Sequence, residues 1–138
     1  NPKNDSYEYI LVPNATKTDL EEMENKLPFE IVNTIKTQEV VSSDKTIAGI
    51  IFYKAGKSTT FGGIEVDKPC LLMLKKQADG FQVSVADPTQ KLSDISIVLN
   101  GGFFGEFAKS ENGKTKLKIV LPQNGEAGKT VTLKLYDK

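Results

Sequence analysis

The carboxylates are the residues of this chain with the most direct capacity for chemistry. Glu21, Glu22 and Glu24 crowd one short segment, and Asp87 and Asp94 flank a loop farther along. Pairs of carboxylates act as acid and base in glycoside hydrolysis, and clusters of carboxylate oxygens bind calcium. Neither group has a recognisable spacing for these tasks. The simpler interpretation is that the glutamates lie near a helix N-terminus, where their charge is favourable, and that Asp87 serves turn chemistry.

The residue types that most often support catalysis are missing. The sequence has no histidine, no arginine and no tryptophan, so it lacks the usual acid–base group, the forked cation that holds carboxylates, and the ring that stacks on sugars. Its one cysteine, Cys70, begins the apolar run Cys70–Leu74, where a thiol usually behaves as a small buried hydrophobe. We therefore predict no catalytic residue, no metal site and no cofactor, which disfavours a free-standing enzyme.

The overall charge also excludes several partners. Eighteen basic residues, all lysine, balance 18 acidic ones, so no net field draws the molecule toward nucleic acid or an anionic membrane. The glycine pairs at 62–63 and 101–102 match no phosphate-binding loop. No apolar run approaches the roughly 20 residues that cross a bilayer. We predict no nucleic-acid partner and no membrane partner, and any site for a polyanion must be a local patch.

One such patch is predicted near the C-terminus. Lys116, Lys118, Lys134 and Tyr136 fall at outward positions of two strand-like segments. If the two strands form a hairpin, these side chains share its exposed face and make a strip that attracts a sulfated or uronic-acid polymer. The alternative is a solvated sheet face, because lysine commonly protects exposed strands from aggregation. These four residues are the substrate-binding candidates of the sequence.

A second candidate surface is aromatic. Phe103, Phe104 and Phe107 lie close together in a less regular segment. They are candidates for a platform under a sugar ring, but phenylalanine more often packs in a core or between domains. The packing interpretation makes this cluster the better candidate for docking to another domain.

The apolar periodicity predicts one helix and many short strands. A first strand is predicted at Tyr7–Val12, and Thr16 or Thr18 can cap a short helix over 19–26 that ends before Pro28. Further strands are predicted at residues 29–35, 39–42, 46–53, 64–66, 70–76, 81–85, 95–99, 116–121 and 130–136.

This order of elements predicts an all-β fold. Many short strands, one early helix and no alternation of strands with helices are typical of an antiparallel β-sandwich, here with one short N-terminal helix. The only candidate boundary lies after the helix, between residues 25 and 37. The chain begins at Asn1 without an initiating methionine, which we interpret as a piece of a longer polypeptide with any export signal upstream.

Several segments resemble one protein family, in the same order along the chain. Residues 1–16 (NPKNDSYEYILVPNAT) resemble the stretch that closes the central β-domain of family 8 polysaccharide lyases. Residues 31–34 and 37–41 are similar to the opening of that family's C-terminal β-sandwich, and Val85–Gln90 resembles its SDPTQ turn. The C-terminal third of the chain shares only a general β pattern with the family.

The resemblance implies a domain organisation and a parent enzyme. Residues 1–28 correspond to the tail end of the central β-domain, and residues 29–138 to the C-terminal β-sandwich domain. Family members cleave acidic glycans of the hyaluronan, chondroitin or xanthan type by β-elimination, in which a base takes the C5 proton of a uronic acid. Their Asn, His, Tyr and Arg catalytic set lies on an upstream α/α toroid. None of it carries over here, because histidine and arginine are absent and Tyr7 and Tyr9 match a strand of the central domain.

The implied role of this chain is therefore non-catalytic. It supports the lyase and offers a surface for polymer, with the upstream catalytic domains and an acidic polysaccharide as partners, in a secreted or periplasmic protein. The alternative is an autonomous carbohydrate-binding module, which the missing tryptophan disfavours. The two differ in one respect: a module binds polymer alone, whereas a supporting domain exposes an apolar patch that its parent covers.

Overall fold

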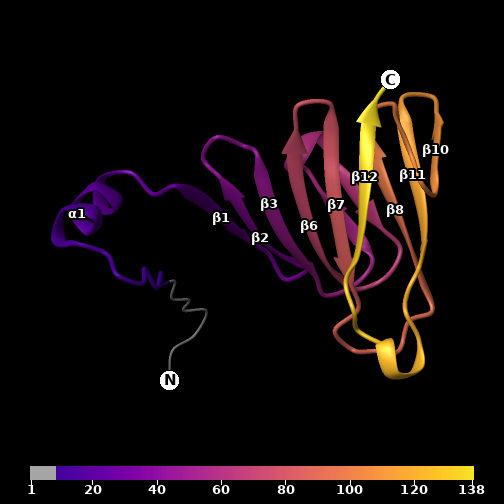
Figure 1. The fold of residues 1–138 in the computed structure, drawn as a ribbon, viewed down its shortest axis with the longest axis horizontal. Helices are drawn as coiled ribbons and strands as arrows, with labels where there is room; N and C mark the ends of the chain where they lie inside the picture. The colour runs from indigo at the N-terminus through magenta and orange to yellow at the C-terminus, as the bar shows by residue number, and fades with distance from the viewer. Residues whose placement is uncertain (1–8) are drawn as a thin grey trace.

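Alternation of buried and exposed side chains along the strands builds two antiparallel β-sheets that pack face to face (Figure 1). The computed structural model describes residues 9–138. A single α-helix precedes the sheets, and all strand pairs are antiparallel. The predicted antiparallel β-sandwich with one short N-terminal helix is confirmed.

The larger sheet has seven strands, and its order differs from the chain order where connections cross to the other sheet. From one edge to the other the strands are β1 (Phe29–Asn33), β2 (Thr37–Ser42), β3 (Ile47–Phe52), β6 (Cys70–Gln77), β7 (Gly80–Ala86), β12 (Val131–Asp137) and β9 (Phe103–Gly105).

The smaller sheet has five strands. In order they are β10 (Ala108–Glu111), β11 (Lys114–Val120), β8 (Asp94–Asn100), β5 (Ile64–Val66) and β4 (Gly56–Ser58). Two short 3₁₀ turns, η1 (Thr60–Gly62) and η2 (Asn124–Glu126), lie in the connections.

The hydrophobic core lies between the two sheets. In the smaller sheet, alternate residues of β8 and β11 point inward, so that Ile95, Ile97, Leu117 and Ile119 are completely buried. They meet the inward residues of the larger sheet, among them Ile50, Phe52, Leu72, Leu74, Val83, Val85, Leu133 and Leu135. Successive side chains of a strand point to opposite faces of the sheet. One side chain that points into the core therefore determines which face every other residue of that strand occupies.

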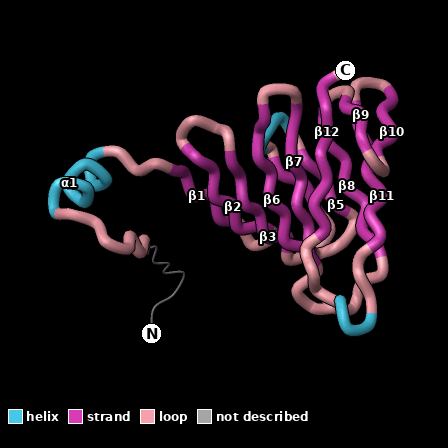
Figure 2. The backbone as a smooth tube through the Cα atoms, viewed as in Figure 1, coloured by secondary structure: helices cyan, strands magenta, loops and turns pink. Residues whose placement is uncertain are grey.

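The helix α1 (Lys17–Asn25) begins two residues before the predicted segment 19–26, and Thr16, one of the two predicted caps, is its N-cap. The Thr16 hydroxyl accepts from the Asp19 N–H at 3.2 Å, and the Asp19 carboxylate accepts from the Thr16 N–H at 2.8 Å, which forms a capping box. No residue of α1 is buried, and Figure 2 shows the helix apart from the strands. No helix within residues 9–138 is long and apolar enough to cross a membrane.

The first predicted strand is not formed as expected. Tyr7 and Glu8 lie outside the described residues, and Tyr9–Val12 adopt no strand. A strand needs a neighbouring edge for its backbone hydrogen bonds, and no described strand pairs with this segment. Residues 9–12 thus have the composition of a strand, but within the described residues no neighbouring strand forms backbone hydrogen bonds with them.

Three short strands escaped the sequence prediction. β4 and β9 have only three residues each, and β10 has four. Two of them contain glycine and β10 is mostly polar, so none carries a clear alternation of apolar residues. They form because neighbouring strands offer edges for backbone pairing: β5 for β4, β12 for β9 and β11 for β10.

Two adjacent residues of β11 test the face assignment. Ile119 is fully buried and Val120 is 66% exposed, so Ile119→Ala should lower the free energy of unfolding by about 2–5 kcal/mol, whereas Val120→Ala should cost less than about 1 kcal/mol. Urea unfolding of both variants measures the difference. Equal losses would contradict the assignment of the core face.

Candidate functional site

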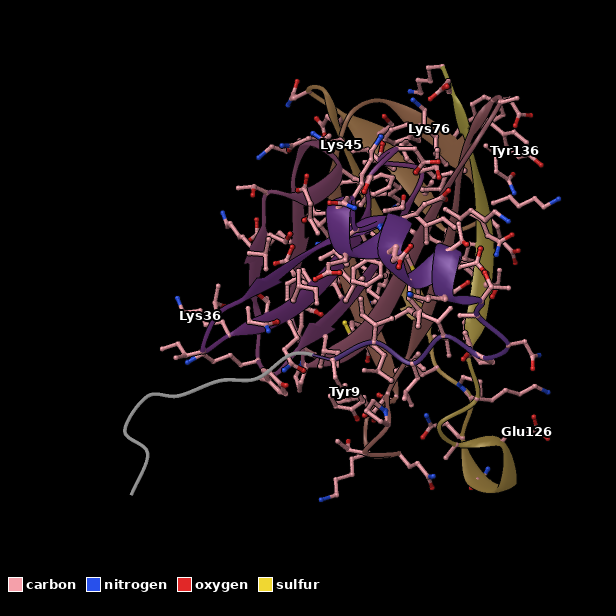
Figure 3. All side chains as sticks on the ribbon, turned by 90° about the vertical axis from the view of Figure 1, so that its left-hand side faces the viewer. Tyr9, Lys36, Lys45, Lys76, Glu126 and Tyr136 are labelled. Atoms are coloured by element: carbon pink, nitrogen blue, oxygen red, sulfur yellow. The ribbon has the colours of Figure 1, made fainter. Side chains whose placement is uncertain are left out.

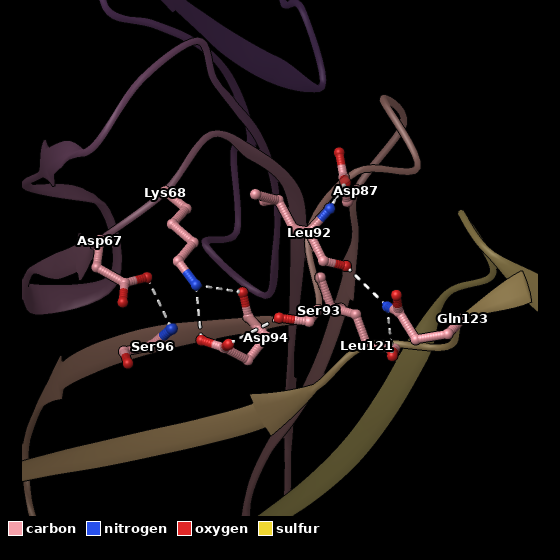
Figure 4. Close-up of polar contacts among 9 residues, drawn as sticks. All are labelled: Asp67, Lys68, Asp87, Leu92, Ser93, Asp94, Ser96, Leu121 and Gln123. Carbon is pink, nitrogen blue, oxygen red and sulfur yellow. Dashed lines mark hydrogen bonds and ion pairs between the residues drawn. The ribbon is translucent and has the colours of Figure 1, made fainter.

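Of the carboxylates that suggested acid–base chemistry, Asp87 and Asp94 are occupied by structural contacts, whereas Glu21, Glu22 and Glu24 lie on the exposed helix α1. Asp94 accepts from the Lys68 ammonium at 2.7 Å and from the Ser93 hydroxyl at 3.1 Å (Figure 4). The hydrogen bond from Lys68 is the main cause that lowers the pKa of Asp94, with Ser93 next. Asp67 accepts from the Ser96 N–H at 2.8 Å. These side chains fix the start of β8 and leave no matched pair of acid and base.

Asp87 closes the connection between β7 and β8, where the chain crosses from one sheet to the other. One carboxylate oxygen accepts from the N–H and the hydroxyl of Thr89 at 2.8 and 2.7 Å, and the other accepts from the N–H groups of Lys91 and Leu92, both at 2.8 Å. The side chain is 3% exposed. Gln123 extends the contact by donating to the Leu92 carbonyl at 2.9 Å. The predicted turn chemistry of Asp87 is confirmed.

The pKa of Asp87 reflects two opposing influences. Burial is the largest of them and raises the pKa, but the hydrogen bonds from Thr89, Leu92 and Lys91 together outweigh it and lower the pKa to about 2. The carboxylate is therefore ionised at neutral pH and held as an acceptor. It is a loop-stabilising group, since all four of its hydrogen bonds go to the loop itself.

The other groups with chemical potential are also held in the framework. Burial raises the pKa of the Cys70 thiol to about 12, which makes it a poor nucleophile. Glu39 is 6% exposed on the inner face of β2 and accepts from the hydroxyls of Ser58, at 2.7 Å, and Thr60. Within residues 9–138, no three histidine, cysteine or acidic side chains gather as metal ligands.

Glu39 was missed by the sequence analysis as a structural residue. It joins the two sheets, because β2 belongs to the larger sheet and Ser58 to β4 of the smaller one. A signal was present: Thr37 and Glu39 occupy alternate positions of a strand and are both buried. A charged residue at an inward position indicates a polar partner across the core.

The four substrate-binding candidates do not form one strip. β11 pairs with β10 and β8, whereas β12 pairs with β7 and β9, so the predicted C-terminal hairpin is wrong. Lys116 and Lys118 lie on the outer face of the smaller sheet, and Lys134 and Tyr136 lie on the larger sheet. The ten-residue connection from 121 to 130 carries the chain across instead of turning it back. Whether these residues bind a substrate stays a prediction.

The aromatic cluster is divided in the same way. Phe103 is partly buried and meets Phe81 edge to face, with 5.4 Å between ring centroids, and Phe81 meets Phe61 at 5.6 Å. Phe104 is 53% exposed and stacks on Tyr136 at 5.4 Å. Figure 3 shows Tyr136 at the opposite end of the molecule from Glu126. Phe103 therefore completes the core, and the exposed rings of Phe104 and Phe107 form only a small surface.

A much larger apolar surface covers the outer side of the seven-stranded sheet. Cross-strand register places Ile31 beside Val40, Ile51 beside Leu71, and Met73 beside Gly49. We call Ile31, Val40, Ile51, Leu71 and Met73 the apolar face. They line a groove of about 710 Å³ whose rim includes Tyr9, Asn33, Gln38, Ser84 and Thr130.

The sequence carried a signal for this face that the analysis did not use. In β3 and β6, apolar residues occupy both the inward and the outward positions, as in Ile50-Ile51-Phe52 and Cys70–Leu74. An antiparallel strand with one wet face usually alternates apolar and polar residues, and an unbroken apolar run is typical of strands covered on both sides. The apolar face is the candidate functional site of the described chain.

Comparison with known proteins gives one family. A model described as polysaccharide lyase family 8, C-terminal β-sandwich domain, matches residues 31–96. Chondroitinase-AC from Pedobacter heparinus is 36% identical over 137 residues, which covers 96% of this chain and 18% of that protein.

Solved structures give the same architecture. A xanthan lyase from Paenibacillus superposes with a TM-score of 0.74 at 24% identity, covering 92% of this chain and 13% of its own. A chondroitinase AC lyase, from a study of oligosaccharide complexes, has a TM-score of 0.70 at 30% identity over 88% of this chain and 17% of its own. Chondroitin AC lyase from Streptomyces coelicolor A3, in complex with chondroitin sulphate, has a TM-score of 0.71 at 13% identity, covering 91% and 17%. The chain spans less than a fifth of the length of each of these relatives.

The Asp87 loop yields a stability prediction. Asp87→Asn should lower the free energy of unfolding at pH 7 by about 1–3 kcal/mol, because a neutral amide cannot accept all four hydrogen bonds. The matched control is Asp79→Asn in the exposed β6–β7 turn, where the side chain is not buried, with an expected change within about 0.5 kcal/mol. Urea unfolding measures both.

The same pair of variants tests the pH dependence. Asp87 has a pKa of about 2 in the folded chain, below its usual value of 3.8. Its ionised form therefore stabilises the fold at pH values above the unfolded pKa, and this stabilisation is lost as pH falls through the folded pKa. The stability difference between the native chain and Asp87→Asn should therefore shrink as pH falls from about 5 toward about 2. A difference that stays constant over this window would refute the assigned role.

Proposed function

The chain belongs to family 8 of the polysaccharide lyases as a C-terminal β-sandwich domain, and from this premise we propose that it is a supporting domain that docks through its apolar face onto the upstream part of the same polypeptide. The apolar face is the observation that carries the proposal. Val40 is 45% exposed, Leu71 38% and Met73 52%, although β2 and β6, which carry them, are each paired on both sides and have only β3 between them. Contiguous exposed apolar surface of this kind usually marks an interface.

The occupant of the groove follows from the path of the chain. Tyr9 lines the groove together with Ile31 and Met73, so the segment that leads into the sandwich lies beside this face. The chain also spans only 18% of its curated relative. An upstream domain that continues from this segment is therefore the nearest available cover for the apolar face.

The proposed domain boundary lies between residues 28 and 29. Leu20 is 52% exposed and Leu27 48%, and α1 buries no residue. The helix is tied to the sandwich near its end, where Ser43 donates to the carbonyls of Leu27, through its hydroxyl at 2.9 Å, and Pro28, through its N–H at 2.8 Å. We assign residues 1–28 to the tail end of the preceding central β-domain, which would cover the leucines, and 29–138 to the C-terminal sandwich.

The activity that we propose for the parent protein is β-elimination on an acidic glycan of the hyaluronan, chondroitin or xanthan type. We propose that this chain supplies no acid or base to that reaction, because its buried carboxylates, Glu39 and Asp87, are held by hydroxyl and backbone N–H groups and it contains no histidine or arginine. The partners are the upstream catalytic domains. We propose that the parent is secreted or periplasmic, as the family resemblance implies, where polysaccharide substrates are accessible.

Matched valines test the docking role. Val40→Glu changes the apolar face, and Val120→Glu changes an equally apolar, 66% exposed residue on the outer face of the smaller sheet. In the 138-residue chain both should be close to neutral, within about 1 kcal/mol. In the full polypeptide, Val40→Glu should lower the thermal midpoint by several degrees through an unfavourable buried charge, and Val120→Glu should not. Indistinguishable midpoints in the full polypeptide would sink the proposal.

The absence of catalysis is tested on the chain alone. Incubation with hyaluronan, chondroitin sulfate or xanthan should produce no ultraviolet absorbance of unsaturated uronate above that of a heat-denatured sample. The full polypeptide serves as the positive control. Growth of absorbance with the chain alone would overturn the supporting role.

A further inference from the structure

The outer face of the smaller sheet concentrates lysine. Lys109 of β10 and Lys114, Lys116 and Lys118 of β11 are all exposed and point away from the core. We call these four residues the lysine face. None of their ammonium groups forms an ion pair within residues 9–138. Lys118 interacts electrostatically with Asp94, whose carboxylate is already bonded to Lys68.

One pair of these lysines is unfavourable for the domain by itself, whereas Lys114 is directly opposite Glu111 of β10. Lys109 and Lys116 are directly opposite each other across the β10–β11 pair, and like charges in that position repel. Three of the four lysines are on β11, which is paired on both sides and has no open edge to protect. Protection against edge aggregation therefore explains Lys109 but not Lys114, Lys116 and Lys118. A bound polyanion would offset the repulsion.

A polar cleft continues the lysine face. It has a volume of about 360 Å³ and is lined by Lys57, Gly62, Gly63, Asn100 and Lys114, among others. The Asn100 amide donates to the Gly62 carbonyl at 2.7 Å, which fixes its orientation, and Lys57 pairs with Glu65 at 3.1 Å. We call this concavity the side cleft. It is lined by amide, hydroxyl and ammonium groups and by the Glu65 carboxylate that pairs with Lys57. The amide and the hydroxyls suit a ligand with hydroxyl groups, and Lys114 attracts negative charge.

The lysine face and the apolar face lie on opposite sides of the sandwich. The first is the outer side of the five-stranded sheet and the second is the outer side of the seven-stranded sheet, with the core between them. An upstream domain on the apolar face would thus leave the lysine face open to solvent, so docking to the parent and binding of polymer by the chain alone, which were expected above as alternatives, can occur in one domain.

We propose that the lysine face and the side cleft bind a linear anionic polysaccharide. The choice of a polysaccharide over another polyanion rests on the proposed function. It is also favoured by the outward side chains of β8, β10 and β11, none of which is aromatic, because single-stranded nucleic acids are usually held by stacking on aromatic rings. In the parent protein this surface would bind polymer outside the catalytic domains. The bound polymer would then have a higher local concentration near those domains.

The test is the double variant Lys109→Gln/Lys116→Gln in the 138-residue chain. Its affinity for chondroitin sulfate, measured by retardation in gels that contain the polymer, should fall about fivefold or more relative to the native chain. The matched control is Lys36→Gln/Lys75→Gln, which removes the same charge from exposed lysines of the larger sheet and its β1–β2 turn and should bind as the native chain does. The thermal midpoint of Lys109→Gln/Lys116→Gln should not fall, because a repulsive pair is removed.

Several outcomes would overturn the inference. They are the absence of retardation of the native chain, equal losses in the two double variants, or equally strong binding to single-stranded RNA. Binding should also weaken steeply as salt rises from about 0.1 M to about 1 M, since the screening length falls from about 10 Å to about 3 Å. Val40→Glu, on the opposite face, should bind chondroitin sulfate normally, so a failure of the docking role and a failure of the lysine face give different results.

Discussion

The packing of two sheets against each other is the constraint on which the rest of this structure depends. Inward residues of β8 and β11, such as Ile97 and Ile119, are fully buried against β6 and β7. The burial of such side chains is the main favourable term in folding, and one inward residue fixes the face of its neighbours along the strand. Burial in the core therefore decides which residues lie on the two outer faces. Those outward residues are available for contacts with other molecules.

The connections that cross between the sheets show how polar groups adapt to this core. The backbone of a crossing loop leaves the sheet ladder, so its N–H groups need other acceptors. Asp87 supplies two carboxylate oxygens to the β7–β8 crossing. Thr115 does the same at the β8–β9 crossing, where its hydroxyl accepts from the Phe103 N–H and donates to the Gly101 carbonyl, both at 2.8 Å. Buried polar side chains thus stabilise the crossings.

The two outer faces differ sharply in chemistry. The face of the larger sheet is apolar around Val40, Leu71 and Met73, whereas the face of the smaller sheet carries lysines that repel one another. Exposure of an apolar surface to water is unfavourable, and so is the repulsion between crowded like charges. Each face is therefore stabilised by a different kind of partner. A supporting domain between an upstream domain and an acidic polymer accounts for both faces with one orientation.

The sequence by itself determined the helix, the longer strands and the inward faces of those strands. The helix cap, predicted at Thr16 or Thr18 and found at Thr16, the alternation of Ile95, Ile97 and Leu99, and the Asp87 turn all depend on neighbours close in the chain. Strand pairing was decided only by the tertiary structure, because a ladder joins segments distant in sequence. That pairing placed Lys116 and Lys134 on different sheets and assembled the apolar face from β1, β2, β3 and β6. Local periodicity shows which way a side chain points, and only the sheet order shows which side chains it lies beside.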